Sequence, residues 1–115
     1  MTETQRPWGS YETLYEEDAS FLLKKIKVKP SSKLSLQSHE YRSEYWVIIS
    51  GKGKVVIGDD TIFVATGSFI YIPKNVKHRI INECFTESLV FVEVQVGSIL
   101  KEDDIVRYED DYGRL

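Results

Sequence analysis

The chain has 115 residues with a formal net charge of −3; 42% of its residues are hydrophobic and 29% are charged. This length suits one domain, and this balance is typical of a globular protein, not of a disordered chain. The negative charge disfavours a nucleic acid as the main partner. A small anionic ligand remains compatible with it, because a pocket can be locally basic on an acidic protein.

Apolar runs in the chain are of strand length, as at residues 46–49. None approaches the roughly 20 residues that cross a bilayer, so we expect no membrane partner. Residues 1–6 lack the apolar core of a signal peptide. The single cysteine, Cys84, has no partner for an internal disulfide. We therefore expect a cytoplasmic protein.

Short β-rich runs separated by turn residues account for most of the chain. Residues 22–29 form a predicted strand that ends before Pro30, because proline cannot donate to a ladder. Eight or nine short strands with no sustained helical period before residue 100 predict an all-β fold, a closed barrel or jelly roll. For the acidic stretch 102–114 we expect one or two helical turns packed on the barrel, or a coil. The further predicted strands are 34–37, 44–49, 54–57, 61–64, 68–72, 78–82 and 89–96, with a hairpin turn at 58–60.

The only two histidines lie close to other candidate ligands. Gln37 and His39 would point the same way on a strand, and a turn through residues 40–43 would bring Glu44 back beside them. Together with His78, these residues predict a site for one divalent metal ion, zinc foremost, with manganese, cobalt or iron as alternatives. On spacing alone, a hydrogen-bonding pair is the commoner role of a His beside a Glu, so both interpretations stay open.

Two segments, about residues 31–51 and 67–82, resemble the paired motifs of cupins. The gap from Glu44 to Gly51 matches the first motif. Gly67, Pro73, His78 and Asn82 fall in register with the second. Three positions depart from the motifs: Ser31 and Asn75 replace glycines, and Gln37 replaces a histidine. Asparagine tolerates the left-handed backbone that glycine serves, so the change at Asn75 is mild.

Nearly the whole chain, residues 6–114, is similar to the C-terminal domain of type II phosphomannose isomerases, which are usually fused to a mannose-1-phosphate guanylyltransferase domain. In that family the Gln-x-His pattern is normal, so the resemblance keeps Gln37 in the metal set. It implies one cupin domain over residues 1–115, here without the transferase domain. The matching stretches are 6–11, 34–39, 71–73, 78–79, 93–95, 102–107 and 111–114, with Arg42, Glu44 and Trp46.

Several further residues are candidates for roles near the metal, and the resemblance supports one of them, Arg42. The family's arginine at the position of Arg42 belongs to the active site, and a guanidinium suits a sugar oxyanion or a phosphate. Lys24 and Glu93 are candidate general bases, although the pattern of alternation leaves open which face of each strand is interior. Arg107 and Arg114 are candidate substrate ligands in the acidic tail. We expect Trp8 and Trp46 in the core or at a dimer contact.

The leading hypothesis is a metal-dependent isomerase that interconverts mannose 6-phosphate and fructose 6-phosphate and feeds GDP-mannose and polysaccharide synthesis. One alternative is an isomerase or epimerase of another sugar phosphate or nucleotide sugar. Another is a non-catalytic sugar-binding cupin that partners a separate guanylyltransferase. We also expect a homodimer, because a barrel of this size has exposed sheet edges and an apolar face.

Overall fold

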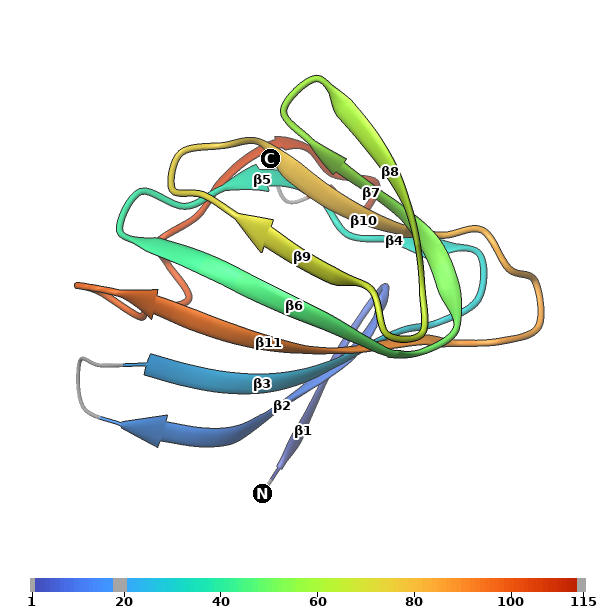
Figure 1. Ribbon diagram of the computed structural model, residues 1–115, viewed down its shortest axis with the longest axis horizontal. Helices are drawn as coiled ribbons and strands as arrows, with labels where there is room; N and C mark the ends of the chain where they lie inside the picture. Colours follow the sequence, from blue (N-terminus) through green and yellow to red (C-terminus); the bar gives the residue numbers. More distant parts are fainter. Residues whose placement is uncertain (1, 18–20, 114–115) are drawn as a thin grey trace.

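The computed structural model describes residues 2–17 and 21–113, and within them every regular element is a β-strand. One sheet has the strand order β1-β2-β3-β11-β6-β9 and the other β12-β5-β10-β7-β8, with β4 paired to β10 (Figure 1). The strands are β1 (Glu3–Arg6), β2 (Gly9–Glu17), β3 (Phe21–Val28), β4 (Ser32–Lys33), β5 (Leu36–Ser38), β6 (Arg42–Ser50), β7 (Lys52–Ile57), β8 (Asp60–Ala65), β9 (Phe69–Ile72), β10 (His78–Asn82), β11 (Leu89–Gly97) and β12 (Val106–Glu109).

The predicted all-β fold is confirmed, and each of the eight predicted strands has a counterpart. The turn predicted at 58–60 joins β7 to β8, where Ile57 pairs with Asp60. The expectation of helical turns in the acidic tail is wrong: its residues 106–109 form β12, which pairs with β5. Pairing with β5 satisfies backbone groups that a short isolated helix would leave to water.

The inner face of β3, β11 and β6 divides into an apolar and a polar half. Residues that face one another across these strands form rows, and all of them are buried. Each large apolar side chain in the apolar half contributes about 1.5–3 kcal/mol through burial. Burial in the apolar half therefore stabilises the barrel, so that the polar half can hold charged side chains in the interior. The rows of the apolar half are Ile26, Phe91 and Ile48, then Val28 and Leu89. The rows of the polar half, which also include the apolar Trp46 and Leu22, are Lys24, Glu93 and Trp46, then Leu22, Gln95 and Glu44.

Two departures from the cupin motifs have a backbone explanation. Asn75 has φ 63° and Ser31 has φ 55°, so both occupy the left-handed region that the motif glycines serve. Gly51, which the motif retains, has φ 90°, and a Cβ there would lie 2.7 Å from the carbonyl oxygen of Ser88. The mild effect expected of asparagine at position 75 is consistent with this conformation.

Asn82, the last residue of the second motif, ties three segments together from a buried position. Its Nδ2 donates to the carbonyl oxygens of Val28, Lys29 and Glu87 at 3.1, 3.2 and 2.9 Å. Its Oδ1 accepts a hydrogen bond from the backbone N–H of Cys84 at 3.0 Å. The side chain thus joins the end of β3 to the loop that leads into β11.

Within the described residues, no helix has the length and apolar character needed to cross a membrane.

Candidate metal centre and its pocket

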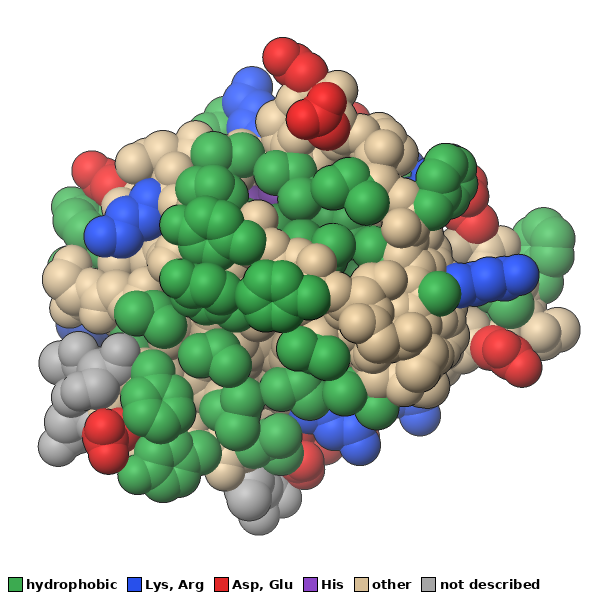
Figure 2. All heavy atoms as spheres, viewed as in Figure 1, with side chains coloured by type: hydrophobic (Ala, Val, Ile, Leu, Met, Phe, Trp, Pro, Cys, Tyr) green, Lys and Arg blue, Asp and Glu red, His purple; other side chains and the backbone are tan. Residues whose placement is uncertain are grey.

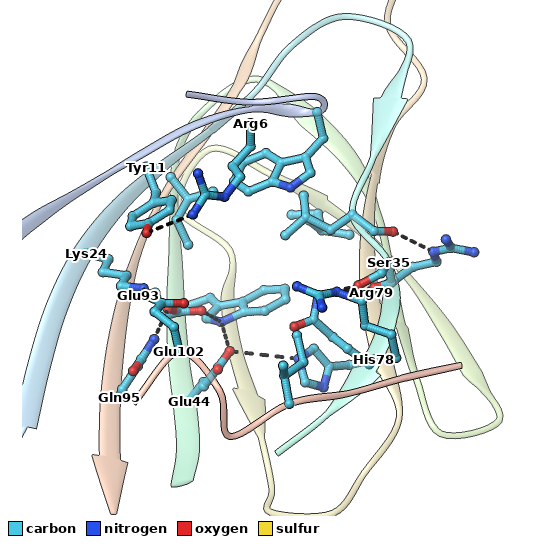
Figure 3. A pocket seen from close by; sticks show the side chains of 18 of the residues that line it. Arg6, Tyr11, Lys24, Ser35, Glu44, His78, Arg79, Glu93, Gln95 and Glu102 are labelled. Carbon is cyan, nitrogen blue, oxygen red and sulfur yellow. Dashed lines mark hydrogen bonds and ion pairs between the residues drawn. The ribbon is translucent and has the colours of Figure 1, made fainter. Parts of the chain in front are cut away.

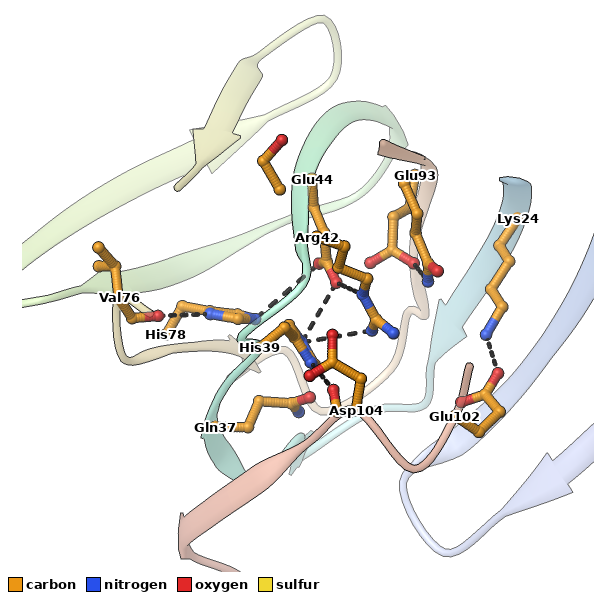
Figure 4. A network of polar contacts seen from close by, with 12 residues as sticks. Lys24, Gln37, His39, Arg42, Glu44, Val76, His78, Glu93, Glu102 and Asp104 are labelled. Carbon is orange, nitrogen blue, oxygen red and sulfur yellow. Dashed lines mark hydrogen bonds and ion pairs between the residues drawn. The ribbon is translucent and has the colours of Figure 1, made fainter. Parts of the chain in front are cut away.

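Three predicted ligands come together from three separate segments. His39 follows β5, Glu44 lies on β6 and His78 begins β10, and one ligand atom from each lies within 4.8 Å of the others. The distance from His39 Nε2 to Glu44 Oε2 is 3.2 Å, and that from His78 Nε2 to Glu44 Oε1 is 3.9 Å. All three side chains are buried, and Figure 4 shows both imidazoles directed toward the Glu44 carboxylate.

The outer ring nitrogens fix the orientation of both imidazoles. Nδ1 of His39 lies 2.7 Å from the carbonyl oxygen of Asp104, and Nδ1 of His78 lies 3.0 Å from that of Val76. A carbonyl oxygen only accepts, so each Nδ1 carries the proton and each Nε2 keeps a free electron pair. Histidines that bind metals are held by outer hydrogen bonds of this kind.

Both imidazoles are neutral at neutral pH. Burial, followed by the charge of Arg42, lowers the pKa of His39 to about 4. Burial also lowers the pKa of His78. Neutral imidazole is the form that binds a metal ion, and two nitrogens with one carboxylate suit a divalent first-row ion. The residues present therefore fit a metal of the predicted kind.

Gln37 lies on β5 at the edge of the same cluster, beside His39 (Figure 4). Its Nε2 contacts the carbonyl oxygen and Oγ of Ser35 at 3.3 and 3.2 Å. The amide nitrogen is thus engaged with Ser35, and Oε1 is the atom that could serve a metal.

Arg42 is buried at the start of β6, not in a turn as its spacing suggested. It is 6% exposed, and its Nε donates to Glu44 Oε2 at 2.8 Å. Its NH2 lies 3.3 Å from His39 Nε2. Burial opposes the charge, but the carboxylates of Glu44 and Glu93 outweigh it and raise the pKa of Arg42. A permanent cation therefore lies against two predicted metal ligands.

Glu93 on β11 faces the interior and shares a donor with Glu44. The indole Nε1 of Trp46 lies 3.0 Å from Glu44 Oε1 and 3.1 Å from Glu93 Oε1. Gln95 Nε2 donates to Glu93 Oε2 at 2.7 Å. Burial, and then the charge of Glu44, raises the pKa of Glu93 well above its usual range. Trp46 lies in the core as expected, but its link between the two carboxylates was not predicted.

Lys24 also faces the interior, where it pairs in register with Glu93. Its Nζ forms an ion pair with Glu102 from the segment between β11 and β12, and it lies 4.3 Å from the ring centroid of Tyr11. Sequence reasoning missed Tyr11 and did not single out Glu102, although both lie in stretches that carry the family resemblance.

Of the two predicted substrate ligands in the tail, one is described. Arg107 on β12 pairs in register with Gln37 and lines the pocket beside the metal cluster. Arg114 lies outside the described residues.

The pocket that joins these residues is rich in positive charge (Figure 3). Five cations and three carboxylates line it, although the whole chain is negative. Its free volume is about 90 Å³, below the roughly 300–1,000 Å³ typical of small-molecule pockets. The cations are Arg6, Lys24, Arg42, Arg79 and Arg107, and the carboxylates are Glu44, Glu93 and Glu102.

This fold is that of the cupins. A solved structure described as the Schizosaccharomyces pombe Cnp3 cupin domain superposes with a TM-score of 0.73 at 15% identity, covering 76% of this chain and 64% of that one.

Residues 1–110 match the family model described as Mannose-6-phosphate isomerase C-terminal, and the chain belongs to that family. It is 45% identical over 109 residues to Xanthan biosynthesis protein XanB of Xanthomonas campestris pv. campestris, which covers 95% of this chain and 23% of XanB. It is 41% identical over 113 residues to mannose-1-phosphate guanylyltransferase of Escherichia coli K12, covering 98% and 23%. The chain thus spans about a quarter of the length of these curated relatives.

Proposed function

We propose that the chain is a metal-dependent aldose–ketose isomerase that interconverts mannose 6-phosphate and fructose 6-phosphate. One observation carries the proposal: a buried His39, Glu44 and His78 cluster opens on a cationic pocket that also holds Glu93. Membership of the isomerase family supports the choice of reaction. Relatives described as a xanthan biosynthesis protein and a mannose-1-phosphate guanylyltransferase support a role in supplying GDP-mannose and polysaccharide synthesis.

The metal would be a divalent ion, zinc foremost, held by His39, Glu44, His78 and Gln37. When bound, it would polarise the sugar carbonyl and neutralise negative charge that develops on the sugar oxygens. Arg42 supplies a second positive charge next to the same oxygens.

We assign proton transfer between carbons 1 and 2 to Glu93. Glu93 lies on β11, next to the strand that carries Glu44, and it lines the pocket. The Trp46 indole N–H contacts the carboxylates of both residues. Lys24, the other candidate base, has its Nζ engaged in an ion pair with Glu102, so this atom is already committed to another partner. In its carboxylate form Glu93 removes the proton from carbon 2, the hydroxyl proton on that carbon passes to the oxygen of carbon 1 in the enediol, and Glu93 returns its proton to carbon 1. The raised pKa of Glu93 makes it a stronger base than an ordinary carboxylate.

A coupled assay of the purified, metal-loaded protein with mannose 6-phosphate tests the proposal. We expect conversion to fructose 6-phosphate, with loss of activity after chelation and in Glu93→Gln. Activity on another sugar phosphate alone would move the assignment to that substrate. If the loaded protein binds mannose 6-phosphate without converting it, the binding-module alternative replaces the isomerase.

A further inference from the structure

Lys24 holds a positive charge in a place where charge is costly. It is 5% exposed on the inner face of β3, and a buried ammonium needs a paired anion. Its anion is the carboxylate of Glu102, whose own side chain is 64% exposed. The cation is thus part of the barrel wall, whereas the anion reaches it from a surface segment.

Arg6 and Tyr11 complete the surroundings of this pair. The Tyr11 ring has Lys24 Nζ 4.3 Å and Arg6 Cζ 5.2 Å from its centroid, and Arg6 NH2 lies 3.4 Å from the Tyr11 hydroxyl. Figure 3 shows Arg6, Tyr11, Lys24 and Glu102 on one side of the pocket. Both cations therefore lie against the same aromatic ring.

The Glu102 carboxylate responds to several cations at once. Partial removal of this carboxylate from water raises its pKa, but the charges of Lys24, then Arg42 and Arg6, lower the pKa by more, so the net shift is downward. A position where three cations stabilise one negative group also suits a phosphate, which carries more charge and more acceptor oxygens than a carboxylate.

The small pocket volume also indicates that Glu102 occupies space that a ligand could fill. With Glu102 in place, about 90 Å³ is free, which is small for a ligand site. Withdrawal of an exposed side chain enlarges the pocket at the position of its carboxylate without disturbing the barrel.

We propose that the Glu102 carboxylate occupies the binding site of the substrate's phosphate group, and that the phosphate displaces it to bind Lys24 and Arg6. This inference rests on the proposed function, since it places the phosphate of the hexose phosphate opposite the metal-binding end of the pocket. Glu102 then competes with the substrate for one cation and favours phosphorylated sugars over neutral ones, because only a strong anion displaces it.

Calorimetric titration of the metal-loaded protein with inorganic phosphate, mannose 6-phosphate and mannose tests the inference. Lys24→Gln should weaken binding of both phosphates by about tenfold or more, the usual effect of losing a charge-assisted hydrogen bond. Arg6→Gln should weaken it several-fold. Glu102→Gln should tighten it several-fold, because the competing charge is gone. Mannose should bind equally to all of these, and Lys101→Gln, an exposed neighbour on the same segment, is the matched control.

Each result decides a different question. Unchanged phosphate affinity in Glu102→Gln and Arg6→Gln would overturn the inference, even if Lys24→Gln failed to fold. Isomerase activity in the wild type would in that case still support the proposed function. If the variants shift phosphate affinity as expected but no sugar is isomerised, the phosphate site stands and the isomerase proposal falls.

Discussion

The backbone carbonyl of Asp104 accepts a hydrogen bond from Nδ1 of His39 at 2.7 Å. The carboxylate of the same residue accepts from the N–H groups of Glu40 and Tyr41 at 2.9 and 3.0 Å. One residue of the segment between β11 and β12 therefore holds both the ring of a predicted metal ligand and the backbone that follows it.

Asp104→Ala should weaken metal binding, but by less than the about 10- to 100-fold that loss of a ligand's outer hydrogen-bond partner costs. The carbonyl remains in this variant, but the backbone at residues 40 and 41 loses its acceptors, so His39 is less well positioned. Competition with a chromophoric chelator measures the affinity. Asp103→Ala, at the exposed neighbour, is the control. Equal affinities of the two variants would show that the Asp104 carboxylate has no role in the site.

Protein purified without chelator should contain one equivalent of divalent metal per chain. His39→Ala and His78→Ala should each lower this content, because each removes one of the few donors in the cluster. Elemental analysis gives the stoichiometry. A full equivalent of metal in the double variant would contradict the ligand assignment.

Arg42→Ala should retain the metal and lose most of the turnover. The metal donors stay in place, whereas the positive charge beside the sugar oxygens is lost. Arg42→Lys should recover only part of the activity, since lysine supplies charge without the planar fork. Steady-state kinetics with metal analysis checks both effects. Full activity in Arg42→Ala, beside an inactive Glu44→Ala, would mean that the substrate lies elsewhere.

The protein should form a homodimer through the outer face of β6 and β9. Apolar side chains gather over this sheet (Figure 2), and Tyr45 contacts Tyr71 and Phe69 with ring centroids 5.0 and 6.3 Å apart. β9 is also the edge strand of its sheet. An apolar face with an open edge favours pairing with a second copy. The exposed members of the face are Tyr45, Val47, Ile49, Phe69 and Tyr71.

Multi-angle light scattering tests this arrangement. The wild type should have the mass of two chains, and Val47→Lys should shift it toward one chain, because it places a charge in the apolar face. Phe85→Lys alters an exposed aromatic in the loop before β11 and should leave the dimer intact. A monomeric wild type at working concentration would rule out the dimer.

Asn82→Ala should lower the free energy of unfolding by about 1–3 kcal/mol. The backbone groups that the Asn82 side chain binds would then lose their hydrogen-bond partner while remaining away from water. Asn82→Asp should be no better, because carboxylate oxygens cannot donate to the three carbonyls. Urea denaturation measures both. Thr86→Ala, at an exposed position nearby, should stay within about 0.5 kcal/mol of the wild type. A comparably small loss in Asn82→Ala would show that water replaces its hydrogen bonds.

Sequence alternation and turn residues predicted most of the barrel, because eight strands carry a recognisable period of two. β2 was missed, since its residues are mostly polar and only half-buried. The tail was misjudged for a different reason. Nothing within residues 106–109 distinguishes a strand from a helical turn until the edge of β5 offers a partner.

The metal ligands were predictable because they lie in short motifs, whereas their supporting contacts were not. Asp104 meets His39 across 65 positions of sequence, and Glu102 meets Lys24 across 78. The interior face of β3 could not be chosen either. Lysines occur on both of its faces, and only the register against β11 places Lys24 inside.

The division of the barrel into an apolar and a polar half should make local stability differ between the two halves. Backbone amides around Val28, Leu89 and Phe91 lie under side chains that exclude water, so their protons should exchange only on global unfolding. The segment that carries Glu102 and Asp104 is exposed or half-buried, so its amide protons should exchange through local opening. The fold thus separates a rigid base from an adaptable rim, and changes in substrate preference can accumulate at the rim while the base keeps the protein folded.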